Sequence, residues 1–280
     1  MLQLLAPPPT GYAPRNVLRQ LERIEQLPVQ TSGAYLVRDG EQVCGTICVE
    51  RGRVCWAAAR GLASRLTDRL CEVEKNPERR DALHHLYRRC MSEQLPLGAT
   101  LVKSQVVTEE VWREALTQHT AESLLQLSPF LSRVPAWLGH DSGTYQSDFA
   151  LDGVEVAAGI GALLHHRSKQ LAAVEFGQVL PRDVFAAAFV WPQEEIDHFP
   201  VFASKSHDHS VASVLDLGRW GHQQLQLLHV VVERCQVVTG IFERSQAVVC
   251  WNYDAGYCVA LCNDGKQMAR LLSNLSRRGK

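Results

Sequence analysis

Residues 32–59 read SGAYLVRDGEQVCGTICVERGRVCWAAA, and this stretch decides the fold expected for the first half of the chain. It contains three short apolar runs, which are interrupted by RDG at 38–40 and by ERGR at 50–53. Short runs of β-branched and aromatic residues separated by glycine turns are typical of consecutive antiparallel strands. The stretch therefore predicts a three-stranded β-meander, and it carries no catalytic motif.

Helices are expected on both sides of this meander. Apolar residues recur at helical spacing over 14–27, before it, and over 61–73 and 81–91, after it. Thr108 precedes two glutamates and a further apolar series. A threonine in that position is a good N-cap, so a helix is predicted from there to about Leu127.

Length and composition favour a globular protein with two domains. The chain has 280 residues, of which 46% are apolar, and 29 basic residues balance 30 acidic ones. A net charge of -1 supplies no global field that would attract nucleic acid or an anionic membrane. The start, MLQLLAPPPT, lacks the basic residues and the long apolar run of a signal peptide, and no apolar stretch approaches a membrane span. We therefore expect a cytoplasmic protein.

A segment rich in proline, glycine and small polar residues, 129–145, is the best candidate for a domain boundary. The sequence thus predicts a flexible N-terminus over 1–14, a first domain over 15–130, a linker over 131–150 and a second domain over 151–280. The expected fold class is α+β, with a meander and helices in the first domain and an α/β sandwich with an antiparallel sheet in the second.

The second domain is expected to mix helices and strands. Its predicted elements are a helix over 153–166, a strand over 172–178, an apolar run of undecided type over 183–191, a short strand over 201–204, a long helix over 210–235, strands over 237–243, 247–253 and 256–262, and a helix over 265–275. Ser210 is the expected cap of the long helix.

The meander, the helix expected after it, and residues 96–127, PLGATLVKSQVVTEEVWREALTQHTAESLLQL, together resemble the PATAN domain, the PatA N-terminal type of bacterial signalling proteins. The turn ERGR at 50–53 matches the strand–turn element of that pattern, and PLG at 96–98 with VTEE at 107–110 matches its helical insert. The resemblance covers about 15–130. It implies a non-enzymatic interaction module.

From 152 to 280, the order of elements resembles the roadblock/dynein-light-chain fold, a profilin-like α/β sandwich. This resemblance implies a dimerising scaffold that engages small Ras-like GTPases or motor complexes. The chain departs from the pattern at 183–191 and in the acidic segment after it, which lengthen the first connection between strands.

The long helix is apolar on two sides. One side can cover the sheet, and glycines at 218 and 221 permit the close approach of another backbone. The other side is the candidate partner or dimer interface, and it consists of Leu217, Trp220, Gln224, Leu227 and Val231. If that side is exposed, a second chain is needed to cover it. Burial within one domain, or against the first domain, is an alternative of equal weight.

A second candidate contact rim follows the apolar run at 183–191. It consists of Trp191, Glu194, Glu195, Asp197 and Phe199. Aromatic side chains beside charged ones are typical of the rim of a protein interface. A solvated loop insertion is the alternative interpretation.

The sequence offers no catalytic residue, metal ligand set or cofactor motif. It contains no P-loop, HExxH or GxSxG motif. The run HDH at 207–209 is more typical of a loop before a helix than of a metal site. The nine cysteines lie mostly in apolar surroundings, and this favours a role as small core residues. A nucleophilic pair such as Cys250 with His222 stays an alternative.

These observations favour a non-enzymatic regulatory or scaffold protein of bacterial signalling or polarity. The expected partners are proteins, among them a small Ras-like GTPase or a second copy of the C-terminal domain, and not nucleic acid or a membrane. Two other functions stay open. One is a GTPase regulator that acts as an activating or exchange factor on its partner, and the other is an enzyme with an unrecognised cysteine or histidine site.

Overall fold

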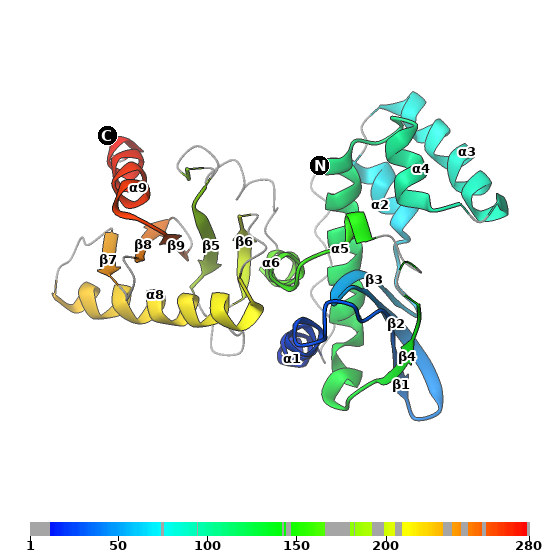
Figure 1. The fold of residues 1–280 in the computed structure, drawn as a ribbon, viewed down its shortest axis with the longest axis horizontal. Coiled ribbons are helices and arrows are strands. Elements are labelled where there is room, and N and C mark those ends of the chain that lie inside the picture. Colours follow the sequence, from blue (N-terminus) through cyan, green and yellow to red (C-terminus); the bar gives the residue numbers. More distant parts are fainter. Residues whose placement is uncertain are drawn as a thin grey trace. The chain divides into compact units, whose positions relative to one another are not determined.

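The structure is a computed structural model, and it confirms a mixed α and β chain with antiparallel sheets (Figure 1). It describes residues 12–73, 76–93, 95–141, 143, 147–165, 180–181, 183–191, 199–204, 209–231, 237–241, 246–253 and 256–278. The chain divides into two compact units, of which the first holds residues 9–156 and the second residues 157–280.

The predicted meander is present in the first unit. It consists of β1 (Gly33–Asp39), β2 (Gln42–Glu50) and β3 (Arg53–Ala59), and neighbouring strands are antiparallel. Gly40 and Gly52 have positive φ angles of 59° and 72° in the two turns. Glycine adopts this backbone conformation without the steric penalty that other residues meet. The two glycine turns are therefore what lets the three runs fold back on one another.

A fourth strand, β4 (Ala136–Gly139), lies beside β1, so the sheet has the order β3-β2-β1-β4. It belongs to residues 131–150, for which the sequence predicts a linker. The Trp137 ring holds the strand in place, because it packs over the bare backbone of Gly33 and lies 4.6 Å from the Tyr35 ring, centroid to centroid. Four residues between prolines and glycines are too short to show strand alternation in the sequence.

Helices precede and follow the three consecutive strands of this sheet in the chain. They are α1 (Pro14–Glu25), α2 (Leu66–Val73), α3 (Pro77–Glu93), α4 (Leu97–Lys103) and α5 (Glu109–Leu127), so every helix predicted here is confirmed and α4 is an addition. The predicted cap is also confirmed, since the Thr108 hydroxyl accepts a hydrogen bond of 3.3 Å from the Val111 amide. Most of α5 is buried, and it packs along β3.

The two units divide inside α6 (Gly153–Leu164), after Val156. This point lies beyond the predicted linker. The reason is that Glu155, in the first turn of α6, is bound by Arg113 of α5, which attaches that turn to the first unit.

The second unit contains a five-stranded sheet of order β6-β5-β9-β8-β7, in which all neighbours are antiparallel. Its strands are β5 (Phe185–Val190), β6 (Pro200–Ala203), β7 (Val237–Ile241), β8 (Ala247–Tyr253) and β9 (Gly256–Cys262). The apolar run at 183–191, whose type the sequence leaves undecided, is thus a strand. The strand predicted over 172–178 lies outside the described residues.

Two helices pack on opposite faces of this sheet. The first is α8 (Val211–Val231), in which Gly218 lies against the Phe189 ring, and Gly221 lies against Val259. The Ser210 hydroxyl accepts a hydrogen bond from the Ser213 amide, which confirms the predicted cap.

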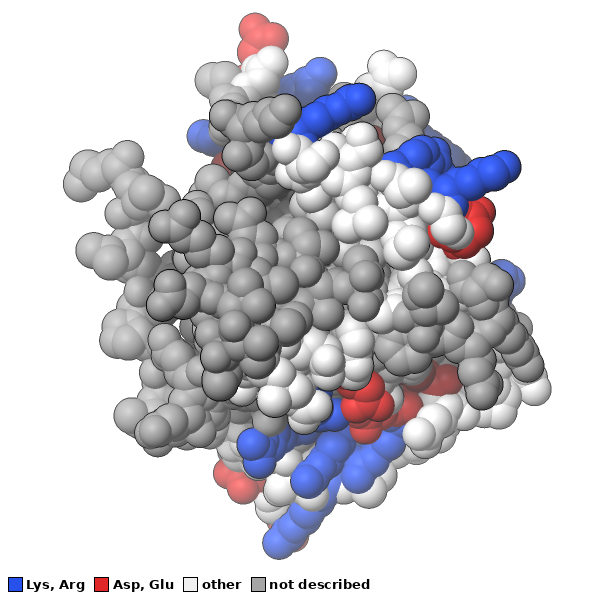
Figure 2. Space-filling view, turned by 90° about the vertical axis from the view of Figure 1, so that its left-hand side faces the viewer, with Lys and Arg blue, Asp and Glu red and all other residues white. Residues whose placement is uncertain are grey.

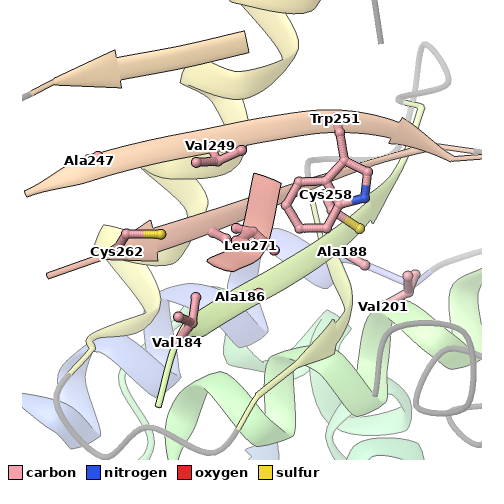
Figure 3. Packing of buried hydrophobic residues seen from close by; sticks show 11 residues of the cluster. Val184, Ala186, Ala188, Val201, Ala247, Val249, Trp251, Cys258, Cys262 and Leu271 are labelled. Carbon is pink, nitrogen blue, oxygen red and sulfur yellow. The ribbon is translucent and has the colours of Figure 1, made fainter. Parts of the chain in front are cut away.

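On the other face, α9 (Gly265–Arg278) inserts Leu271 into a buried apolar cluster (Figure 3). The cluster contains Val184, Ala186, Ala188, Val201, Ala247, Val249, Trp251, Cys258, Ala260, Cys262 and Leu271. Two of its members are cysteines, and six of the eight cysteines that the structure describes are buried. The expected core role of cysteine is therefore confirmed for those six.

Candidate functional site

Helix α8 has a buried side and a polar side. The buried side, which faces the sheet, consists of Val211, Val214, Leu215, Gly218, Gly221 and Leu225. The polar side is exposed and carries Asp216, Arg219, Gln223 and Gln226. Arg219 and Asp216 form an ion pair there, with an N–O distance of 2.6 Å. These two sides account for the amphipathic part of the helix, but not for all of its apolar residues.

A third side of α8 carries the residues that the sequence proposes as an interface. Leu217, Trp220 and Gln224 are half-buried, and Leu227 is 63% exposed. We call these four residues the α8 stripe. They are separated by three, four and three residues, which places them above one another along one side of the helix. The same spacing characterises the core positions of a coiled coil.

The fifth proposed residue, Val231, continues this spacing at the last position of α8. Its side chain lies outside the described residues. The stripe thus remains open to a partner at Leu227, which is exposed. The other three residues of the stripe are only half-buried. An apolar row of this kind is typical of a helix that packs against another helix.

The residues of the second proposed contact rim do not form one exposed surface. Phe199 is only 1% exposed, so it belongs to the core and not to an exposed rim. It precedes β6 at the point where Gly161 of α6 approaches that strand closely, which explains its burial. Glu194, Glu195 and Asp197 lie outside the described residues.

Of the two rim residues that the structure describes, Trp191 stays partly exposed. Its ring lies 5.0 Å from the Tyr257 ring and 5.6 Å from the His222 ring, so it packs on the sheet and on α8. Burial among these rings lowers the pKa of His222. The three rings form a packed aromatic cluster at the end of β5.

The pair of Cys250 and His222, considered from the sequence, does not form a nucleophilic site. Cys250 is 0% exposed in β8 and cannot be reached by a substrate. A different cysteine and histidine meet instead. The Cys71 sulfur of α2 lies 3.6 Å from Nε2 of His84 in α3, where Cys71 is half-buried and His84 is exposed. The sequence places these residues on separate helices, and no periodicity could have revealed their contact.

A metal centre is not found in the part of the chain that the structure describes, since no three His, Cys, Asp or Glu residues are gathered there. Within the same ranges, no helix has the length and apolar character needed to cross a membrane. Figure 2 shows both basic and acidic side chains on the described surface of one face, with uncharged side chains between them. Neither sign of charge covers the described part of this face.

Comparisons with known proteins do not identify a family. No protein-family model matches the chain, and neither a curated protein nor a solved structure was found to be similar to it.

Proposed function

We propose that this chain is a non-enzymatic regulatory or scaffold protein that binds protein partners. In this proposal the first unit is a PATAN-like interaction domain and the second unit is a roadblock-like domain, as found in bacterial signalling or polarity. The three layers of the second unit support the proposal, because α8, an antiparallel sheet and α9 are stacked as in an α/β sandwich.

The observation that carries the proposal is the α8 stripe. Leu217, Trp220 and Leu227 add apolar area to a side of α8 that does not face its own sheet, and Leu227 alone leaves 63% of its surface in water. Covering such a row by a second helix gains about 25 cal/mol for each Å² of apolar area removed from water. The stripe therefore fits a protein partner that presents a helix.

A second copy of the chain is the partner that we propose first. The stripe has the alternating three and four spacing that lets two identical helices interlock, and it has a polar residue, Gln224, among its apolar ones. A single polar residue in such a seam specifies register and the number of chains. Two copies of Gln224 that meet across a two-fold axis would satisfy each other's amide groups.

Size-exclusion chromatography with light scattering tests this interface. Wild-type protein is expected to be a dimer, and Leu227→Glu is expected to be a folded monomer, because it buries a charge in the seam. Gln226→Glu is the matched control, since it adds the same charge one residue earlier on the polar side, and it should stay dimeric. A monomeric wild type would show that the stripe does not join two copies, and the self-associating scaffold would be rejected.

A small Ras-like GTPase is the second proposed partner. Purified GTPases of this class, loaded with GDP or with a non-hydrolysable GTP analogue, should bind wild-type protein with an affinity that depends on the nucleotide. Rates of GTP hydrolysis and nucleotide exchange, measured in the same mixture with GTP, distinguish a scaffold from a regulator. Unchanged rates of hydrolysis and exchange are expected for a scaffold, whereas a faster rate of either would establish the GTPase regulator instead.

A further inference from the structure

Cys71 and His84 form a contact between α2 and α3 that the proposed binding function does not use. The Cys71 sulfur lies 3.6 Å from Nε2 of His84, although the residues are 13 positions apart and belong to different helices. His84 is exposed, and Cys71 is one of two cysteines in the described part of the chain that are not buried. Water and small solutes can therefore reach this pair.

The position of Cys71 is fixed by its own helix. Arg69, two residues earlier in α2, lies 2.7 Å from the carboxylate of Glu122 in α5. Both side chains of this ion pair are largely buried. This pair anchors α2, and with it the thiol, to α5, and α3 packs against α2, so the imidazole lies beside the thiol before any reagent arrives.

The surroundings of Cys71 make a base necessary for its reaction. Burial raises the pKa of the thiol, Arg80 opposes that change, and Asp68 and Glu72 add to it. Little thiolate is present at neutral pH as a result, and the thiolate is the nucleophilic form of cysteine. In the tautomer that carries its proton on Nδ1, Nε2 of His84 can accept the thiol proton at the moment of attack.

Cys44, the other half-buried cysteine, provides an internal comparison. Its sulfur lies 3.8 Å from the carbonyl oxygen of Gln42. A carbonyl oxygen can accept a hydrogen bond from a thiol, but it is far too weak a base to take the proton. The two cysteines are thus alike in exposure and differ in the base beside them.

We propose that Cys71 is a thiol-modification site, at which His84 acts as the base for exchange with a small-molecule disulfide. The Cys71 S–H bond breaks and His84 takes the proton, while the sulfur attacks one sulfur of the disulfide. A new S–S bond forms on Cys71, the disulfide bond of the reagent breaks, and the departing thiolate takes the proton from His84. Cys71 is oxidised to a mixed disulfide, and half of the reagent is reduced to a free thiol.

Native full-length protein treated with glutathione disulfide tests the proposal. The reaction is stopped with acid at intervals, and peptide mass spectrometry gives a rate for each cysteine. Cys71 should react at least about tenfold faster than Cys44. General bases in enclosed active sites accelerate reactions by roughly 100-fold or more, and a smaller factor is expected here because this pair is open to water. His84→Gln should reduce the rate at Cys71 to that at Cys44 or below it, and leave the rate at Cys44 unchanged.

Two results would overturn the proposal. One is an equal rate at Cys44 and Cys71 in wild-type protein, which would decide the matter even if the variant failed to fold. The other is an unchanged rate at Cys71 in a His84→Gln protein whose circular dichroism matches the wild type. The readout is covalent modification, so it does not depend on whether the α8 stripe binds a partner.

Discussion

Arg113 of α5 holds Glu155 of α6 with both ends of its guanidinium group. Nε lies 3.0 Å from Oε1, and Nη2 contacts Oε2. The Thr117 hydroxyl shares its one proton between the Arg113 carbonyl oxygen, at 2.8 Å, and Oε1, at 3.3 Å. The two charged side chains are only 16% and 18% exposed. A bidentate pair at this degree of burial is shielded from water and salt more than a surface pair. It attaches the first turn of α6 to the first unit.

Removal of one partner from this pair should be costly. Glu155→Ala leaves the Arg113 charge largely buried without its counter-ion, so we expect a loss of about 2–4 kcal/mol in the free energy of unfolding. Urea denaturation followed by circular dichroism measures it. Asp216→Ala breaks an exposed pair in α8 and should cost less than about 1 kcal/mol. Equal losses in the two variants would show that the Arg113 pair contributes no more than a surface pair.

The close approach of α8 to its sheet predicts a second effect. A Cβ atom at Gly218 would lie 2.6 Å from ring carbons of Phe189, which is fully buried and cannot move aside. Gly218→Ala should therefore lower stability by about 1 kcal/mol or more, although alanine favours a helix over glycine by a similar amount. Thermal unfolding measures the change. Gly265→Ala is the control, since a Cβ there meets nothing within 4 Å, and a loss as large as at Gly218 would contradict the packing argument.

Local signals in the sequence predict much of this fold. Strands β8 and β9 have the predicted bounds, because each is a short apolar run that ends at a turn. The helix caps Thr108 and Ser210 are also predicted correctly, since capping depends on residues only three positions apart. The spacing of the α8 stripe is equally local, whereas the exposure of Leu227 is a finding of the structure that the sequence left open.

Features that depend on distant parts of the chain could not be predicted in this way. Strand β4 depends on the packing of the Trp137 ring against the backbone of Gly33, which is about a hundred residues earlier in the chain. Phe199 is buried by α6 packing and not by any property of its own neighbours in sequence. The contact of Cys71 with His84 likewise depends on how α2 and α3 meet. Periodicity shows which side of an element is apolar, but not which element covers it.

The contact between Trp137 and β1 predicts where the first sheet is weakest. Trp137→Ala removes the ring that covers Gly33 and touches Tyr35, so β4 should detach while the meander persists. We expect hydrogen exchange to become at least about tenfold faster in Ala136–Gly139, with little change in β2 and β3. Leu138→Ala is the matched control, because Leu138 is already 48% exposed and contributes less to the sheet. Faster exchange across the whole meander would refute a role confined to β4.

A buried imidazole makes the first unit sensitive to acid. His119 of α5 is 6% exposed, its ring is stacked on Trp56 at 6.5 Å between centroids, and Nδ1 has no hydrogen-bond partner among the residues that the structure describes. Burial lowers the pKa of His119 below the ordinary value of 6.5, and the charge of Arg69 lowers it further. The unfolded chain therefore binds the proton more readily than the folded one.

This difference should reduce stability as the pH falls below about 6.5, where His119 in the unfolded chain begins to take up its proton. We expect the free energy of unfolding to decrease between pH 7.5 and pH 5.5 in wild-type protein, and to decrease less in His119→Gln, which keeps a polar side chain but cannot be protonated. Urea titrations at both pH values measure the four free energies. His85→Gln is the control, because His85 is exposed, and it should retain the wild-type pH dependence. An equal pH dependence in wild-type protein and in His119→Gln would mean that the buried imidazole does not contribute to acid sensitivity.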